Sequence, residues 1–296
     1  MNTRLTAAPL AALACLLASA CGGITIQTDT DKNTPERTVV EQNSPPTTAP
    51  QSTPTDFATP SPATVTVTAP ATSNPDPDPG NGDLPAKTCP NNSLEGCFTY
   101  DEMQPYINAV LPTIEQFLEA QYKAMPLPDH IWFVEAGTKG ETACTATDGS
   151  PAPYTSLLFL YCPADKSIYT GQDSLWTYYR TMGDAAPAVA IAHEYGHHIQ
   201  LMVEVPEPTT NEESINHENQ ADCIAGAYAG FANDQGWLEK DDISDIDALL
   251  DDIADSEDDP NRSHGVLKER SDAFITGFRN GLTACNAYHA DVPIIQ

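Results

Sequence analysis

The sequence predicts a mostly helical α+β domain that follows a long, disordered linker. Apolar residues recur at helical spacing in several segments after residue 100, and short runs of β-branched and aromatic residues lie between them. Residues 24–88 are instead rich in Pro, Thr, Ser and Asn. The chain of 296 residues contains 13 Lys and Arg against 42 Asp and Glu, a net charge of −29. This balance argues against nucleic-acid binding and against a polybasic membrane patch, because both need clustered basic residues.

The first twenty residues predict a secretory signal. Arg4 precedes an apolar run from about Ala7 to Leu17, and small residues lead to Cys21. The run is too short for a stable membrane-spanning helix, which needs about 20 apolar residues. Small residues directly before a cysteine resemble the bacterial lipobox, so we expect a signal peptide at 1–20 and lipidation of Cys21. Ordinary signal cleavage that leaves Cys21 as a spare thiol is the alternative.

Residues 21–87 are predicted to be a Pro/Thr-rich linker. The segment is dense in proline, and Phe57 is its one aromatic residue. Such a sequence buries too little apolar surface to offset the entropy lost on ordering. The folded domain is therefore expected at 88–296, either anchored by its lipid in the bacterial cell envelope, on the outer face of the cytoplasmic membrane, or secreted.

Six cysteines remain in the folded domain, an even number that indicates disulfides in an exported protein. They are Cys89, Cys97, Cys144, Cys162, Cys223 and Cys285. The sequence does not decide among the possible pairings, but we favour pairing of neighbours for the first four, which leaves Cys223 with Cys285. Zinc ligation by these cysteines is disfavoured because no Cys-x-x-Cys spacing is present.

The first elements of the domain follow from apolar spacing. Tyr100–Lys123 predicts a helix, since one apolar stripe contains Tyr106, Val110, Leu111, Ile114 and Leu118. His130–Val134 and Ser156–Cys162 are strand candidates. Lys166–Thr170 follows a turn sequence and is expected to form a hairpin with the second candidate.

Two further helices are expected. Asp184 resembles a helix cap with Pro187 in the first turn, and this helix should end near Val203. Many of the Asp and Glu residues of the domain lie in residues 239–259. The apolar residues of this segment recur at helical spacing, which predicts an amphipathic helix with a solvated acidic face. A calcium site there is the alternative, but no Asp-x-Asp-x-Asp-Gly loop is present.

The strongest chemical signal is His193-Glu194-Tyr195-Gly196-His197, an H-E-x-x-H motif inside the helix that begins at Asp184. Residues four apart share a helix face, so His193 and His197 can offer two imidazoles to one zinc ion. Glu194 points about 100° away, within reach of a zinc-bound water without being a ligand. Zinc lowers the pKa of that water, and Glu194 can take its proton. Incidental histidines on a buried helix are the alternative.

A catalytic zinc needs a third ligand and one open position. The metzincin pattern requires Gly and His where this chain has Gln200 and Val203, so that class is excluded. Glu218 and Asp222 lie four apart and share a helix face. We expect Glu218 to bind zinc and Asp222 to accept the free N–H of a ligand histidine.

Neighbouring residues offer competing ligands. His217 adjoins Glu218 but points about 100° away on a helix, and it has no acidic partner four residues on. His198 likewise points away from His197 and is expected to be a surface or packing histidine. Cys223 is expected in a disulfide rather than on the metal.

These residues resemble the bacterial neutral zinc metallopeptidases, which are relatives of the gluzincin proteases. The similarity rests on His193–Gln200 and Glu218–Cys223, and it extends to Tyr161–Asp165 upstream and Ser263-His264-Gly265 downstream. The resemblance implies a gluzincin-like zinc-protease domain, mostly helical, with a small sheet beside the active-site helix. It also implies one zinc ion held by His193, His197 and Glu218, with Glu194 as the catalytic base.

A peptidase also stabilises the oxyanion that forms as water attacks the carbonyl, and a His, Tyr or Arg can share this task with zinc. His264 is the candidate; a surface histidine after a helix-capping Ser263 is the alternative. Arg270 could orient a carboxylate or the substrate, or form a salt bridge.

We therefore expect a secreted, lipid-anchored zinc metallopeptidase that acts on peptide or protein substrates. Its acidic surface predicts a preference for cationic substrates. A non-catalytic peptide- or partner-binding module of the cell envelope that retains the protease fold is the alternative, and an acidic spacer with a structural zinc is a third hypothesis. A binding module has no need of Glu194, and the sequence offers no fourth ligand for a closed structural site.

Overall fold

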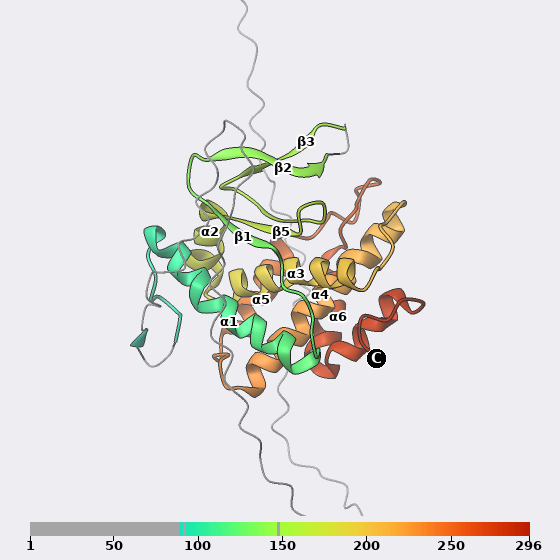
Figure 1. The fold of residues 1–296 in the computed structure, drawn as a ribbon. Coiled ribbons are helices and arrows are strands. Elements are labelled where there is room, and N and C mark those ends of the chain that lie inside the picture. Colours follow the sequence, from blue (N-terminus) through green and yellow to red (C-terminus); the bar gives the residue numbers. More distant parts are fainter. Residues whose placement is uncertain (1–88, 91–92, 147–148) are drawn as a thin grey trace, which may run out of the picture. The chain divides into compact units, whose positions relative to one another are not determined.

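The computed structural model describes residues 89–90, 93–146 and 149–296 (Figure 1). The predicted signal peptide, Cys21 and the predicted linker lie outside the described residues. None of the helices in the described part is long and apolar enough to cross a membrane.

Helices make up most of the described residues, as the sequence predicts. The α-helices are α1 Met103–Gln121, α2 Gln172–Met182, α3 Ala185–Met202, α4 Asn211–Asp234, α5 Asp242–Asp252 and α6 Leu267–Asn280. Two 3-10 helices, η2 Tyr100–Glu102 and η3 Leu282–His289, precede α1 and follow α6.

The strands form two small sheets that lie together on one side of the helices (Figure 1). They are β1 His130–Val134, β2 Lys139–Thr145, β3 Pro151–Thr155, β4 Phe159–Cys162 and β5 Ser167–Gly171. The first sheet has the order β1-β5-β4, with β1 parallel and β4 antiparallel to β5. The second is the antiparallel hairpin β2–β3. The mostly helical α+β class with a small sheet beside the H-E-x-x-H helix is confirmed.

Several predicted elements are found close to their expected bounds. The strand at His130–Val134 is β1, and the two later candidates form the β4–β5 hairpin, with β4 beginning at Phe159 rather than Ser156. The acidic segment contains α5, which turns Ile246, Leu249 and Leu250 into the core. The sequence patterns predict no element over β2, β3, α2 or α6.

Helix α3 is the buried centre of the domain. All of its residues except Ala188, His197, Leu201 and Met202 are buried. Strands β4 and β5 and helices α1, α2, α4 and α5 surround it. A helix that is buried on all sides needs small or apolar residues on every face, and the run of alanines in its first half meets that need.

A glycine sets the distance between α3 and α4. A Cβ atom at Gly196 would lie 2.9 Å from the Cα of Ala221, closer than side-chain carbons approach backbone atoms. The absent side chain allows the two backbones to cross closely. This crossing brings the H-E-x-x-H motif and the acidic residues of α4 together.

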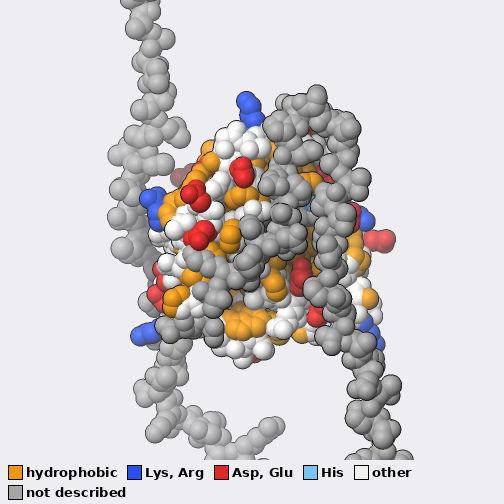
Figure 2. Space-filling model, turned by 60° about the vertical axis from the view of Figure 1, so that its left-hand side comes forward, with side chains coloured by type: hydrophobic (Ala, Val, Ile, Leu, Met, Phe, Trp, Pro, Cys, Tyr) orange, Lys and Arg blue, Asp and Glu red, His pale blue; other side chains and the backbone are white. Residues whose placement is uncertain are grey.

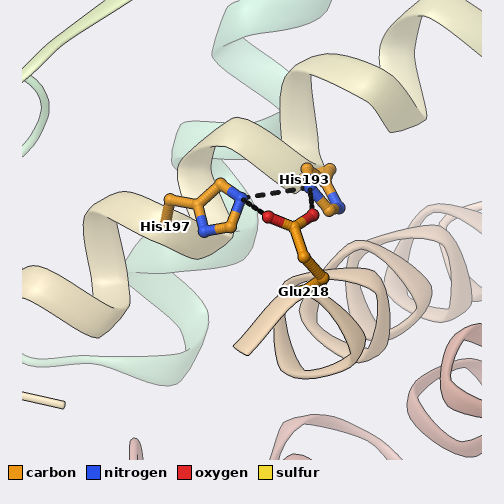
Figure 3. Close-up of side chains that lie close together, drawn as sticks. All are labelled: His193, His197 and Glu218. Carbon is orange, nitrogen blue, oxygen red and sulfur yellow. Dashed lines mark hydrogen bonds and ion pairs between the residues drawn. The ribbon is translucent and has the colours of Figure 1, made fainter. Parts of the chain in front are cut away.

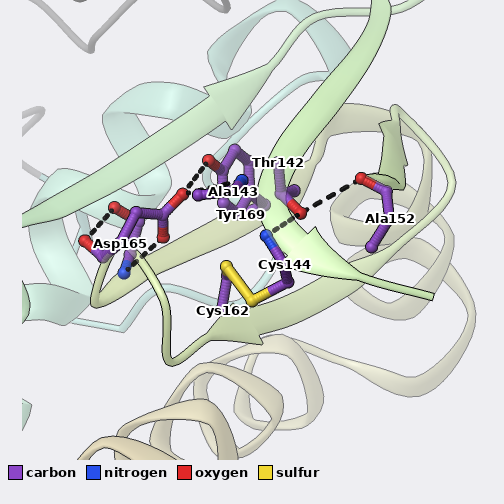
Figure 4. Close-up of a disulfide and its surroundings, with 8 residues drawn as sticks. Thr142, Ala143, Cys144, Ala152, Cys162, Asp165 and Tyr169 are labelled. Atoms are coloured by element: carbon purple, nitrogen blue, oxygen red, sulfur yellow. Dashed lines mark hydrogen bonds between the residues drawn. A yellow bond between two sulfur atoms is a disulfide. The ribbon is translucent and has the colours of Figure 1, made fainter. Parts of the chain in front are cut away.

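Three disulfides tie the periphery to this centre. Cys89 is joined to Cys97, Cys144 to Cys162, and Cys223 to Cys285, which is the pairing that the sequence analysis favours. The second bridge connects β2 to β4, and Asp165 adds to it by accepting hydrogen bonds from the Ala143 amide and the Tyr169 hydroxyl (Figure 4). The hairpin β2–β3 is thereby held onto the first sheet.

Charged side chains are scattered over the face of the domain that Figure 2 shows. On the face that Figure 2 shows, individual acidic side chains and some basic ones lie among hydrophobic and uncharged groups. The chain as a whole has 42 acidic against 13 basic side chains. Its electrostatic field is therefore expected to attract cations more than anions.

Candidate metal centre

Three side chains from α3 and α4 point at one another at the helix crossing (Figure 3). The Nε2 atoms of His193 and His197 lie 3.1 Å apart. The Glu218 oxygens lie 3.2 Å from Nε2 of His193 and 3.5 Å from Nε2 of His197. Two ligands at 2.0–2.1 Å from a tetrahedral zinc are about 3.3 Å apart. The three side chains therefore match the ligand spacing of such a site.

His193 is oriented by Asp222, as the sequence analysis expects. Its Nδ1 lies 2.8 Å from Oδ1 of Asp222. A carboxylate can only accept, so Nδ1 carries a proton, and Nε2, which faces Glu218 and His197, is the nitrogen that can give up its proton to bind a metal. Asp222 is in turn held by Arg270, whose Nη2 donates to the same oxygen over 2.9 Å. Arg270 is 2% exposed, so its salt bridge with Asp222 is internal to the domain.

His197 is oriented by an amide chain that the sequence analysis does not anticipate. Gln200 donates through Nε2 to the carbonyl of His217, which fixes the amide so that its oxygen faces Nδ1 of His197 at 2.9 Å. The same Nε2 donates to Gln220, and Gln220 donates to the carbonyl of Cys285. Both carbonyls can only accept, so the direction of every bond in this chain is fixed. His197 therefore also presents its Nε2 lone pair to the centre.

The electrostatics of the centre favour a bound positive charge. Burial alone would raise the pKa of Glu218, but His197 and His193 hold that pKa well below its usual range. Burial alone would lower the pKa of His193, whereas Asp222 and Glu218 raise that pKa to about 10. Two carboxylates thus act on one small volume, and a cation there, a proton or a metal ion, offsets their charge.

Glu194 is buried on α3, and His264 reaches the same region from the loop before α6. The Nε2 atom of His264 lies 4.0 Å from a Glu218 oxygen, and half of its side chain is exposed. Its backbone N–H donates to Asp255 over 2.7 Å, which fixes this loop. The structure therefore brings His264, distant in sequence, beside the predicted ligands.

The competing residues are not part of the group formed by His193, His197 and Glu218. The His217 ring stacks on His197 at 5.5 Å between centroids, and burial lowers its pKa to about 4, so it stays neutral. His198 bridges the Tyr161 hydroxyl and the carbonyl of Pro126, and burial lowers its pKa too. Cys223 is in a disulfide. Glu218, and not these residues, completes the cluster with the two histidines.

Two cavities meet at the centre, with Phe159, Glu194 and His264 lining both. The first, of about 190 Å³, is bounded by His193 and by a mainly apolar wall. That wall includes Leu158, Tyr178, Val189, Leu249, Leu250 and Ile253. The second, of about 300 Å³, extends past His197 and Glu218 to Tyr161, Leu201, Glu207 and Ser214. Glu194 therefore lies where a chain that occupies both cavities would cross the centre.

Comparison with known proteins gives a family and several relatives. A family profile described as "Putative neutral zinc metallopeptidase" matches residues 83–288. The chain is 27% identical over 216 residues to "Uncharacterized protein YpfJ" of Escherichia coli K12, a match that covers 64% of this chain and 72% of YpfJ. It is 29% identical over 102 residues to "Uncharacterized protein Rv2575" of Mycobacterium tuberculosis, which covers 31% and 33% of the two chains. No solved structure matches.

Proposed function

The chain belongs to the putative neutral zinc metallopeptidase family, and we propose that it is a peptidase that hydrolyses peptide bonds with one zinc ion held by His193, His197 and Glu218. One observation carries the proposal: three ligand groups with tetrahedral spacing converge beside Glu194, where two cavities meet. A structural zinc site would be closed by a fourth ligand, and none of the described residues adds one to this cluster.

The zinc, when bound, supplies an acidified water and a Lewis acid for the scissile carbonyl. Asp222 and Gln200 keep the Nδ1 protons of the two histidines in place, so that both Nε2 lone pairs face the metal position. The chain thus provides two neutral ligands and one carboxylate, together with an open position.

Glu194 is the proposed general base. It takes one proton from the attacking water as the water oxygen bonds to the carbonyl carbon. It then gives that proton to the nitrogen of the peptide bond as the carbon–nitrogen bond breaks. His264, whose Nε2 lies 4.0 Å from a Glu218 oxygen, is proposed to donate to the developing oxyanion. Its half-exposed ring leaves room for it to move toward a substrate.

The apolar cavity indicates a preference for substrates with a hydrophobic side chain next to the scissile bond. Its volume of about 190 Å³ and its wall of Leu, Val, Ile and Tyr side chains suit one such group. Helix α5 supplies Leu249 and Leu250 to this wall, Ile253 directly after the helix adds to it, and the other face of α5 is acidic. The net charge of −29 further favours capture of cationic peptides at low salt.

We also propose that the domain acts outside the cytoplasmic membrane, anchored through lipid on Cys21. The apolar run before Cys21 and the six paired cysteines of the domain support export. Mass spectrometry of the mature protein from bacterial membranes would find a diacylated N-terminal Cys21. An unmodified N-terminus elsewhere would contradict the anchor.

The test of the activity uses the purified full chain, freed of metal and reconstituted with one equivalent of zinc. The protein is incubated with a mixed peptide pool, and the cleavage sites are read by mass spectrometry. We expect cleavage only after reconstitution, next to hydrophobic residues. Stoichiometric zinc without cleavage would contradict the peptidase and favour a binding module, and failure to bind zinc would contradict the site itself.

A further inference from the structure

A second group of ligand-type side chains lies away from the metal centre, at the start of α3. Glu95 belongs to the loop closed by the Cys89–Cys97 disulfide, Asp184 directly precedes α3, and Asp245 comes from α5. One carboxylate oxygen from each lies within 4.8 Å of the other two. The group shares no residue with the proposed zinc site.

One oxygen of the buried Asp184 carboxylate has no partner. The residue is 9% exposed, its Oδ1 has no hydrogen-bond partner, and its side chain does not cap α3 despite its position. Its backbone is held, because its N–H donates to Glu95 and its carbonyl accepts from the Tyr106 hydroxyl. A buried carboxylate oxygen with no donor is costly, and proteins usually satisfy it. Asp184 supplies one of the three oxygens of the group, so a cation bound there would stabilise a carboxylate that the protein alone leaves partly unsatisfied.

Gly183 lets Asp245 reach this position. A Cβ at Gly183 would collide with the Asp245 carboxylate, and its φ of +94° is one that side-chain-bearing residues rarely adopt. Because Gly183 has no side chain, the turn between α2 and α3 leaves room for the Asp245 carboxylate.

The charged side chains that act on Glu95, Asp184 and Asp245 are themselves acidic. Among the described residues, no Lys or Arg forms an ion pair with Glu95, Asp184 or Asp245. Burial, followed by the charges of Asp242 and Glu95, raises the pKa of Asp184 to about 8. Burial and then Asp242 also raise the pKa of Asp245 to about 6. Three carboxylates that repel one another in this way are stabilised by a cation.

We propose that Glu95, Asp184 and Asp245 form a second metal site, which binds a divalent cation of the calcium type. Oxygen-only ligands favour a hard cation. Calcium takes six to eight oxygen ligands in a flexible geometry, whereas magnesium demands a nearly ideal octahedron, so three carboxylates from separate segments suit calcium. Waters would complete the coordination. The cation would join the disulfide loop and α5 to the first residue before the H-E-x-x-H helix.

The test titrates CaCl₂ into zinc-loaded full chain and measures binding by calorimetry and thermal unfolding. At Ca²⁺ about 100-fold above its Kd, we expect one bound ion and a rise in Tm of about 5–10 °C. Asp245→Asn and Glu95→Gln should weaken Ca²⁺ binding at least tenfold. Asp247→Asn, the same change on the exposed face of α5, should bind Ca²⁺ like the wild type.

A second readout separates a cation site from an ordinary structural contact. In calcium-free buffer at pH 7, Asp245→Asn should be as stable as the wild type or more stable, because it removes repulsion. Only the response to calcium should be lost. The proposal is wrong if 5 mM CaCl₂ changes the Tm of none of these proteins, or if Asp247→Asn loses the response as fully as Asp245→Asn. Because zinc stays bound throughout, these results do not depend on peptidase activity.

Discussion

The two histidines of the proposed zinc site are held by different kinds of partner. His193 depends on a carboxylate that is itself paired with a buried arginine, whereas His197 depends on the amide of Gln200, three residues further along the same helix. Each partner fixes a proton on Nδ1 and so leaves Nε2 free for a metal. Substitution of either orienting residue alone, Asp222 or Gln200, should therefore lower the affinity for zinc without abolishing it.

Asp222→Asn tests the first partner. The variant keeps the shape of the side chain but loses the charge that stabilises the Nδ1 proton of His193 and pairs with Arg270. We expect the Kd for zinc to rise about 10- to 100-fold, measured by competition with a chromophoric chelator. Asp234→Asn, at the exposed end of the same helix, is the control. Equal zinc affinity in the two variants would show that Asp222 does not support the site.

We expect His198 to make the stability of the domain depend on pH. Burial lowers its pKa from 6.5, so the unfolded chain takes up a proton that the native chain does not. The stability that this residue contributes is fully present above pH 6.5 and is lost as the pH falls through its lower native pKa. In zinc-free protein, we expect the Tm of His198→Gln to decline less steeply than that of the wild type below pH 6.5. Parallel curves would contradict this assignment.

At the level of single residues, spacing on a helix predicts which side chains lie together one turn apart. It does not predict which side chains of another helix contact them. His193, His197, Glu218 and Asp222 follow from spacing of four residues, and the structure brings these four together. Gln200 lies three residues after His197 and so on the same side of the helix, but a glutamine at that spacing looks like any polar residue on a helix surface. The pairing of Arg270 with Asp222, 48 residues away, depends on how α6 packs on α4 and leaves no local pattern.

Elements α3 and α4 act as one unit because their crossing sets the ligand spacing. Gly196 permits that crossing, and the Cys223–Cys285 bridge ties α4 to η3 close to the carbonyl that anchors Gln220. The Cys144–Cys162 bridge instead ties the β2–β3 hairpin to β4. The two disulfides should therefore support different functions.

Removing each bridge by paired Cys→Ala substitution separates these functions. Loss of Cys223–Cys285 should weaken zinc binding, because the amide chain that orients His197 ends at the Cys285 carbonyl. Loss of Cys144–Cys162 should leave zinc affinity within about twofold and increase proteolytic cleavage in the hairpin. Each loss should also lower stability by about 2–4 kcal/mol. Equal effects of the two pairs on zinc affinity would contradict the proposed chain of contacts.

Element prediction succeeds where the pattern is strong and fails where tertiary contacts decide. The stripe of α1 and the apolar run of β1 are local signals. Strands β2 and β3 contain Gly140, Pro151 and Pro153, which strands usually avoid, and they depend on a disulfide and on Asp165 for their place. Helix α2 begins without a side-chain cap and is rich in aromatic residues, so its sequence does not predict a helix.

At the scale of the whole molecule, two groups of acidic side chains flank α3. Glu218 and Asp222 lie beside its H-E-x-x-H motif, and Glu95, Asp184 and Asp245 lie at its beginning. The proposed zinc site performs the chemistry, and the proposed calcium site fixes the helix that carries it. The charge of −29 predicts an affinity for cations but does not indicate where they bind, and this requires the fold.

Glu194 is the residue that is proposed to make this metal centre a peptidase, and Glu194→Gln removes only its carboxylate. Wild type, Glu194→Gln and the exposed control Glu119→Gln are loaded with one equivalent of zinc, and kcat/KM is measured on a peptide from the cleavage screen. We expect equal zinc content and Tm in all three, a loss of kcat/KM of at least about 100-fold in Glu194→Gln, and no loss in Glu119→Gln. Cleavage by zinc-loaded Glu194→Gln at the wild-type rate would show that Glu194 is not the general base.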